Sequence, residues 1–154
     1  MKIVRILGGL GNQMFQYAFY KALEKRHPKV WADLTLFEDY NLHNGFELND
    51  VFGIDVKEAT RFTVNLYDTA NRKWLFRKLR RFLNLKNAYK EEVNEFLFDP
   101  AFLSDTKPRL YYGYWQNEQY FSDINIRNDF KFKRPLSEKN QQVLNLIENS
   151  QSVS

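Results

Sequence analysis

The chain has 154 residues, of which 44% are hydrophobic, 17% aromatic and 27% charged, with only 6 Gly and 4 Pro. This composition is typical of a folded globular protein and excludes disordered, collagen-like and linker-like chains. The sequence contains no cysteine, which excludes a disulfide scaffold, a thiolate zinc site and a cysteine nucleophile.

The net charge of +4 comes from one segment. Asn71–Lys90 holds eight cations and no acid, so the remaining residues sum to −4. Residues 1–7 lack the pattern of a secretory signal, and no apolar run of about 18 residues follows that would span a bilayer. We therefore expect a soluble protein of the cytoplasm.

The first 37 residues predict a strand, a turn, a helix and a second strand. Ile3, Val4, Ile6 and Leu7 form a short apolar run that stops at Gly8-Gly9-Leu10-Gly11, as a buried parallel strand does where it enters a turn. Apolar residues recur at helical spacing over Gln13–Arg26, and Pro28 marks the stop. Lys29–Phe37 then has the pattern of a strand. Such a βαβ unit predicts an α/β fold, a Rossmann-like parallel sheet with flanking helices, in one domain.

The rest of the chain is less regular. Short irregular pieces are expected over residues 39–59, and a basic amphipathic helix is expected over Asp68–Leu85. Its apolar stripe, predicted to face the core, consists of Trp74, Leu75, Leu79, Phe82 and Leu83. Further expected elements are a strand at Leu110–Trp115, a helix at Asn117–Phe121, a short strand at Phe130–Phe132, and a helix at Glu138–Asn149 capped by Ser137, with Val143, Leu144 and Ile147 facing inward.

The glycine turn between the first strand and the first helix is the clearest candidate site. Such a turn lets backbone N–H groups and the positive helix end approach an anion such as a phosphate or diphosphate. The dinucleotide fingerprint fails because its third glycine falls on Met14, and Asn12-Gln13 stands where a P-loop requires Lys and Ser or Thr. The glycines alone are equally compatible with a tight structural turn. Asn12 either caps the helix or presents its amide to a hydroxylated ligand.

Two segments carry a family resemblance. GGLGNQMFQYAFYKAL at Gly8–Leu23 resembles the opening motif of bacterial α-1,2-fucosyltransferases, which form glycosyltransferase family 11. LYYGYWQNEQYF at Leu110–Phe121 resembles the second landmark of that family and follows at a compatible distance. The resemblance implies one half of a GT-B architecture, in which two Rossmann-like halves face each other. It also implies metal-independent, inverting transfer of fucose from GDP-fucose to O2 of a terminal galactose in a glycan, without a cofactor.

The sequence departs from that family in one respect. The donor-binding pattern H-x-R-R-x-D-Y is missing, because the Arg80-Arg81 pair has Lys78 in place of His and Leu83 in place of Asp. In the family this pattern follows a helix and a polar turn, which is where the present chain stops. Residues 1–154 are therefore expected to form the N-terminal Rossmann-like domain, without the donor-binding half and inactive alone.

The expected substrate-binding residues come from the two landmarks. They are Gly9, Gly11, Asn12 and Gln13 at the turn, and Trp115, Gln116 and Glu118 in the second segment. An aromatic face stacks on sugar C–H groups, and an amide or carboxylate binds hydroxyls. The alternative, favoured for the second segment, is that Trp115 lies in the core and Glu118 on the solvated surface. Asp33 is expected to be structural, His27 and His43 to lie on the surface, and no general base is identified.

The basic helix leaves two further interpretations open. Its cations suit an anionic membrane surface or the phosphates of a nucleic acid; they are Arg72, Lys73, Arg77, Lys78, Arg80 and Arg81. The simpler interpretation, a core-facing stripe with a solvated back paired to Glu91, Glu92 and Glu95, is favoured, and no nucleic acid is expected because +4 is a small charge. The rival to an enzyme is a non-catalytic module that binds a glycan or RNA. A nicotinamide-dependent oxidoreductase is disfavoured by Met14.

Overall fold

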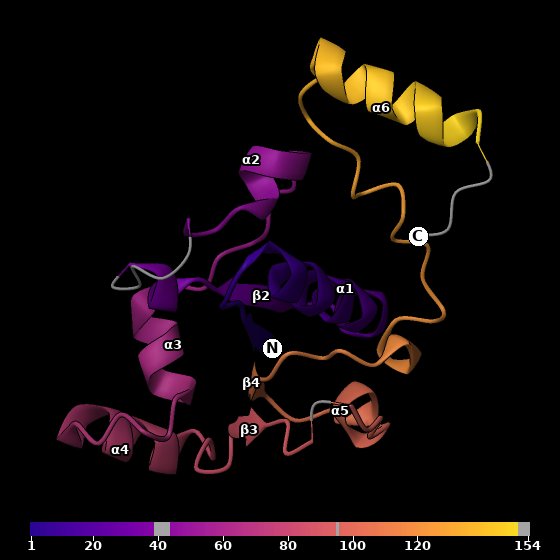
Figure 1. The fold of residues 1–154 in the computed structure, drawn as a ribbon. Helices are drawn as coiled ribbons and strands as arrows, with labels where there is room; N and C mark the ends of the chain where they lie inside the picture. The colour runs from indigo at the N-terminus through magenta and orange to yellow at the C-terminus, as the bar shows by residue number, and fades with distance from the viewer. Residues whose placement is uncertain (39–43, 95, 151–154) are drawn as a thin grey trace.

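The computed structural model describes residues 1–38, 44–94 and 96–150. Its centre is a four-stranded sheet in the order β2-β1-β4-β3, in which every neighbouring pair is parallel (Figure 1). The strands are β1 (Lys2–Arg5), β2 (Val30–Asp33), β3 (Tyr89–Glu91) and β4 (Arg109–Tyr112). The predicted α/β class with a Rossmann-like parallel sheet is confirmed.

Helices cover both faces of the sheet. The long helix α1 (Leu10–Arg26) packs on one face, with Val4 and Tyr111 of the sheet in its core cluster. The helices α3 (Arg61–Tyr67) and α4 (Trp74–Phe82) lie on the other face, where their cluster includes Ile3 and Leu110. This alternation follows from the period of two along a strand. The remaining elements are α2 (Leu48–Phe52), α5 (Ala101–Ser104), α6 (Glu138–Glu148) and the 3-10 turns η1 (Thr35–Phe37) and η2 (Glu118–Tyr120).

The predicted βαβ unit is confirmed, but its second strand is shorter than expected. β1, the glycine turn, α1 and β2 follow one another, and α1 ends at Arg26 before Pro28. The strand predicted to reach Phe37 stops at Asp33. There the carboxylate Oδ1 accepts hydrogen bonds from the N–H and the hydroxyl of Thr35, at 3.0 and 2.6 Å. This local turn ends the ladder and leads into η1.

The predicted helix at Asp68–Leu85 is also shorter. The carboxylate of Asp68 accepts a hydrogen bond from the N–H of Ala70 at 2.8 Å, and Asn71 Oδ1 accepts one from the N–H of Lys73 at 3.1 Å. These side chains compete with helical hydrogen bonds, so α4 begins only at Trp74. A separate helix that was not predicted, α3, precedes this turn, and Thr60 caps its N-terminus.

The orientation predicted for this helix is wrong. Of the five residues assigned to a core-facing stripe, only Leu79 packs partly against the core, and the other four are exposed: Trp74, Leu75, Phe82 and Leu83. Phe76, which was not assigned to the stripe, is buried. Arg80, assigned to the solvated cationic face, is buried as well. The helix is therefore rotated relative to the prediction, because a buried arginine takes the place that an apolar residue was expected to fill.

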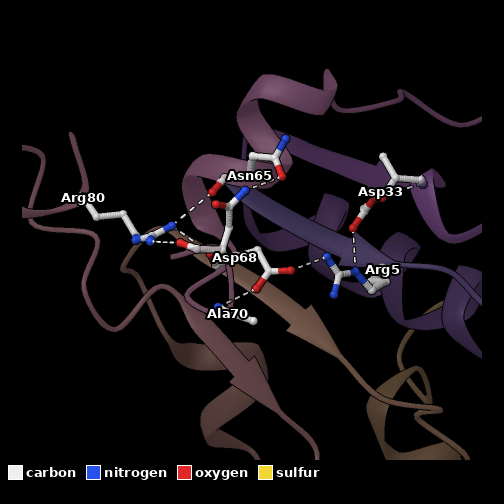
Figure 2. Close-up of polar contacts among 8 residues, drawn as sticks. Arg5, Asp33, Asn65, Asp68, Ala70 and Arg80 are labelled. Carbon is white, nitrogen blue, oxygen red and sulfur yellow. Dashed lines mark hydrogen bonds and ion pairs between the residues drawn. The ribbon is translucent and has the colours of Figure 1, made fainter. Parts of the chain in front are cut away.

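Figure 2 shows why Arg80 is buried. Its guanidinium donates hydrogen bonds to the backbone carbonyls of Asn65 and Asp68, at 3.1 and 2.7 Å, and to that of Asn71. These carbonyls belong to the last turn of α3 and to the segment that follows it. Arg80 thus donates hydrogen bonds to the end of α3 and to the turn that separates α3 from α4.

Four predictions for the C-terminal third need correction. The strand expected at Leu110–Trp115 is β4, which ends at Tyr112, and Trp115 has a φ of +57°, outside the strand region. The helix α6 forms, and Ser137 caps it by accepting a hydrogen bond from the N–H of Asn140 at 3.3 Å. The side chains predicted to face inward do not do so: Val143 and Ile147 are exposed, and Leu144 is half-buried. In Figure 1, α6 stands apart from the sheet at the end of an extended segment. The described residues Phe130–Phe132 form no strand, and the ring of Phe130 packs on Tyr17 and Phe52. The helix expected at Asn117–Phe121 is only the 3-10 turn η2.

Buried tyrosines make stability depend on alkaline pH. Burial raises the pKa of Tyr17, Tyr20 and Tyr111 above the usual value of about 10. Above about pH 10 the unfolded chain loses these protons while the folded chain retains them, so the free energy of unfolding falls. Lys2 acts in the opposite sense between pH 8 and about 10.5, because burial lowers its pKa to about 8.

We expect urea unfolding to give a lower midpoint at about pH 11 than at about pH 9. The Tyr17→Phe/Tyr20→Phe double variant should lose less stability over this interval, because it lacks two of the hydroxyl groups whose pKa is raised in the folded chain. Tyrosinate absorbance of the folded protein gives an independent readout. Ionisation of all tyrosines near pH 10 without unfolding would contradict the expectation.

Candidate functional site

The candidate site lies at the carboxyl edge of the sheet, where β1 and β4 end side by side. The chain runs from β1 outward to β2, whereas β3 and β4 lie on the other side of β1. The direction of strand order therefore changes between β1 and β4. Ligands of open parallel sheets bind outside the carboxyl ends of the strands at such a switch point. The glycine turn follows β1 and the Gly113–Gln116 segment follows β4, so both landmarks reach this place.

Gly8 is required by its conformation and its neighbour. It has a φ of +81°, which side chains of L-residues rarely adopt, and a Cβ built on it would lie 3.0 Å from Nδ2 of Asn12. Gly11 is different: it is exposed, and a Cβ there would meet nothing within 4 Å. Gly9 is the N-cap of α1 and is half-buried. The turn therefore combines a structural glycine with an open first turn of the helix.

Asn12 joins the two landmarks. It is half-buried, and its Oδ1 accepts a hydrogen bond from Nε2 of Gln116 at 2.9 Å. These residues are 104 positions apart in the sequence. Of the two roles considered for Asn12, capping of α1 is not observed, because Gly9 is the N-cap and no side chain caps that end.

Gln16 fixes the two strand ends beneath this pair. Its Oε1 accepts a hydrogen bond from the N–H of Leu7 at 2.9 Å, and its Nε2 donates one to the carbonyl of Gly113 at 3.1 Å. The side chain is fully buried. Gln16 was not predicted as a site residue, although a polar residue on the apolar side of a predicted helix is a signal of this kind of role.

Gln13, a predicted binding residue, uses its side-chain amide for hydrogen bonds within the protein. The side chain is fully buried. Nε2 donates to the carbonyls of Gly8 and Gly45, both at 2.8 Å, and Oε1 accepts from the N–H of Glu47 at 2.9 Å. Gln13 thus holds the glycine turn against the segment before α2, and its contacts are those of a structural residue.

Trp115 lies in the core, which is the alternative considered above. It is fully buried, and its indole stacks on Phe19 with ring centroids 4.0 Å apart. The rings of Phe102 and Tyr120 contact it at 5.0 and 5.4 Å. Both faces and edges of the indole are thus enclosed by protein, so a sugar cannot stack on it in this structure.

Glu92 shapes the turn after β4 and was not identified from the sequence. It is buried, and its Oε2 accepts hydrogen bonds from the N–H groups of Tyr114 and Trp115, at 2.9 and 2.8 Å. A Cβ on Gly113 would lie 2.6 Å from Cβ of Glu92, so this glycine allows the close approach. Glu92 therefore turns toward this segment rather than toward α4, and Glu95 lies outside the described residues.

Two depressions flank the Asn12–Gln116 pair. One, of about 390 Å³, is lined by Gln116, Asn117, Glu118 and Gln119, and Glu118 is exposed within it. The other, of about 190 Å³, is apolar; its lining consists of Gly11, Met14, Phe15, Ala18, Phe121, Ile126 and Phe130. A polar hollow beside an apolar one suits a carbohydrate, which presents hydroxyl groups and C–H faces together.

Asp33 belongs to a buried ionic network rather than to the candidate site (Figure 2). Nε of Arg5 donates to Asp33 Oδ2 at 2.6 Å, and its terminal nitrogen donates to Asp68 Oδ2 at 2.9 Å. Burial alone would lower the pKa of Arg5, but the two carboxylates outweigh it and raise that pKa. The contacts of Asp33 are those of a structural residue, as expected, because its other oxygen, Oδ1, accepts the hydrogen bonds from Thr35 at the turn into η1.

The histidines and other candidate features lie elsewhere. His27 lies at the C-terminal end of α1, and its pKa is lowered mainly by burial and further by the charge of Lys2. His43 lies outside the described residues. Over residues 1–38, 44–94 and 96–150 no group of three or more His, Asp or Glu is placed to hold a metal ion. In the same ranges no helix is both long and apolar enough to cross a membrane.

Comparison with known proteins gives one informative similarity. The chain is 31% identical over 126 residues to a protein named alpha-1,2-colitosyltransferase from Escherichia coli. The matched segment covers 77% of this chain and 40% of that protein, so the chain spans about two fifths of the length of this curated relative. No family model and no solved structure matches the chain. The similarity therefore relates the chain to part of a glycosyltransferase.

Proposed function

We propose that the chain is the N-terminal half of a GT-B glycosyltransferase that transfers fucose from GDP-fucose to O2 of a terminal galactose. The observation that carries the proposal is the hydrogen bond between Asn12 and Gln116, because it brings two separate landmarks into one surface at the switch point of the sheet. The similarity to an enzyme whose name specifies an α-1,2 linkage supports the same reaction class.

In this proposal each group at the edge has a defined task. The N–H groups of Gly11 and Asn12, in the first turn of α1, face the diphosphate or sugar of the donor, and Gly11 leaves room for a close approach. The amides of Asn12 and Gln116 and the carboxylate of Glu118 bind sugar hydroxyls. Donor cations come from a second half, because no Lys or Arg occurs at residues 8–13 or 113–119.

The proposed transfer is a single inverting displacement. The O2 hydroxyl of the acceptor attacks the anomeric carbon of fucose from the side opposite GDP. A new C–O bond forms as the bond to the diphosphate breaks, the hydroxyl proton passes to a base, and GDP leaves with the bonding electrons. Positioning of the acceptor and neutralisation of the leaving diphosphate supply most of the acceleration. This half contributes the positioning.

The 154-residue chain alone should be inactive. We expect no GDP release above background when it is incubated with GDP-fucose and a galactoside, because the loops at residues 8–13 and 113–119 contain no Lys or Arg to neutralise the leaving diphosphate. An enzyme-coupled GDP assay checks this. Turnover above background would contradict the division of tasks between two halves.

A chimera tests the function itself. The chain is joined to the part of the E. coli colitosyltransferase that lies outside the matched segment, and this protein is called here the completed enzyme. We expect it to transfer a sugar to a galactoside, and activated fucose and activated colitose are compared as donors. If the completed enzyme folds and binds the galactoside but transfers neither sugar, the chain is a non-catalytic glycan-binding module instead.

A further inference from the structure

The outer face of α4 combines exposed apolar side chains with exposed cations. Trp74 is 68% exposed, Leu75 51% and Phe82 86%. Arg77, Lys78 and Arg81 are exposed on the same helix. These six residues are called the α4 surface below. Single exposed apolar residues are ordinary, but three large ones on one short helix form a patch that requires explanation.

The fold fixes which face of α4 points outward. Phe76 packs inward against Phe62, with ring centroids 5.5 Å apart, and Arg80 is anchored to backbone carbonyls (Figure 2). At 100° per residue, positions 74, 75, 78 and 82 fall on the side away from these two anchors, and positions 77 and 81 adjoin that side. The exposed aromatic rings are thus held outward by the packing of the opposite face.

The cations of the α4 surface are available to a partner. No ion pair between described residues includes Arg77, Lys78 or Arg81. Nζ of Lys78 lies over the ring of Trp74, 4.3 Å from its centroid, so this charge sits directly beside an apolar anchor. The flanking sequence adds Arg72, Lys73, Lys86 and Lys90, with no acid between residues 71 and 90.

The chemistry of this surface matches an anionic lipid bilayer. Such helices lie in the plane of the interface, with Trp, Phe and Leu inserted among the acyl chains and Lys or Arg at the headgroups. A nucleic acid would engage the cations but leave Leu75 and Phe82 in water. A second copy would bring two clusters of like charge together. Charge and apolar contact together therefore favour a membrane.

We propose that the α4 surface binds the protein peripherally to membranes that contain anionic phospholipids. This inference does not rest on the proposed glycosyltransferase function, because its residues lie on the sheet face opposite α1. It revises the sequence-based expectation in two ways. Arg80 is excluded from the contact because it is buried, and Trp74, Leu75 and Phe82 enter the contact as apolar anchors.

Vesicle flotation tests the proposal. The chain is mixed with vesicles of phosphatidylcholine alone or of phosphatidylcholine with phosphatidylglycerol. We expect binding to the anionic vesicles only, weakened by salt. The Arg77→Gln/Lys78→Gln/Arg81→Gln variant should bind at least tenfold more weakly, because each cation near an anionic surface contributes a factor of about five. The matched control, Lys131→Gln/Lys133→Gln/Arg134→Gln, removes three exposed cations elsewhere and should bind as the parent does.

A second pair of measurements isolates the apolar anchors. The Trp74→Ser/Phe82→Ser variant should keep its fold, checked by thermal melting, and lose at least tenfold in vesicle affinity. Brominated lipids should quench the fluorescence of the parent, and quenching should disappear in Trp74→Phe, which retains Trp31 and Trp115. Equal binding to neutral vesicles, no binding, or affinity unchanged in either α4 variant would overturn the proposal. Dimerisation through these residues, or RNA binding without vesicle binding, would overturn it as well.

Discussion

Replacement of Trp115 by alanine should lower the free energy of unfolding by about 3–5 kcal/mol, the usual cost of deleting a buried aromatic side chain. The indole is fully buried and stacks on Phe19 at 4.0 Å, with Phe102 and Tyr120 against its edges. Its removal leaves a cavity between α1, α5 and η2 that these rigid rings cannot fill. Urea unfolding monitored by circular dichroism measures the loss.

A second tryptophan provides the control. Trp74 is exposed and contacts Lys78 on the surface, so Trp74→Ala should change stability by less than about 1 kcal/mol. Similar losses in the two variants would show that Trp115 is not in the core. Such a result would restore the possibility that its ring stacks on a sugar.

Asn12→Ala in the completed enzyme should reduce turnover at least tenfold, the loss of about 1.4 kcal/mol of transition-state stabilisation. The amide of Asn12 lies half-exposed at the start of α1 and positions Gln116 through a 2.9 Å hydrogen bond. The free energy of unfolding should change by less than about 1 kcal/mol, because alanine favours the helix and compensates for the lost, partly buried hydrogen bond. Steady-state kinetics and thermal melting measure the two effects.

The neighbouring amide separates function from structure. Gln13→Ala removes the buried hydrogen bond to the Gly8 carbonyl and the partly buried ones to the Gly45 carbonyl and the Glu47 N–H, so it should destabilise the chain by about 2–4 kcal/mol. Asn12→Ala should therefore lower turnover with little change in stability, whereas Gln13→Ala should lower stability. Unchanged kinetics in Asn12→Ala would remove Asn12 from the site, and an unaltered melting temperature in Gln13→Ala would contradict its buried role.

The first half of the sheet was predictable because local signals agree there. An apolar run, a glycine turn, helical periodicity and a proline stop all lie within residues 3–28, and the structure has β1, α1 and β2 in that order. What the sequence did not predict was where β2 ends. That depends on the side chain of Asp33, which bonds to Thr35 rather than leaving the ladder to continue.

The α3–α4 region was mispredicted for a tertiary reason. Periodicity assigns Arg80 to the solvated face and Trp74 to the core, which is the rule for an isolated amphipathic helix. In the folded chain the guanidinium of Arg80 binds the carbonyls of Asp68 and Asn71, which follow α3. A pattern of hydrophobicity contains no information about which distant backbone groups lie within reach of a side chain, so the rotation of α4 could not be anticipated.

The candidate site was predicted in location but not in detail. The resemblance identifies both landmarks, and parallel strands place their following loops at one edge. The pairing of Asn12 with Gln116 depends on the strand order, in which β4 rather than β3 lies beside β1. Gln16 and Glu92 were missed because their roles consist of hydrogen bonds to backbone groups that come close only in the folded chain.

Nuclear magnetic resonance titration of the labelled chain tests the central claim most directly. A galactose-terminated oligosaccharide and GDP-fucose are added separately and then together, and backbone and side-chain amide shifts are followed. We predict shifts concentrated at the amides of Gly9, Gly11 and Asn12 and at the side-chain amides of Asn12 and Gln116. An absence of shifts at these positions, or shifts confined to other surfaces, would contradict the assignment of this edge as the sugar-binding site.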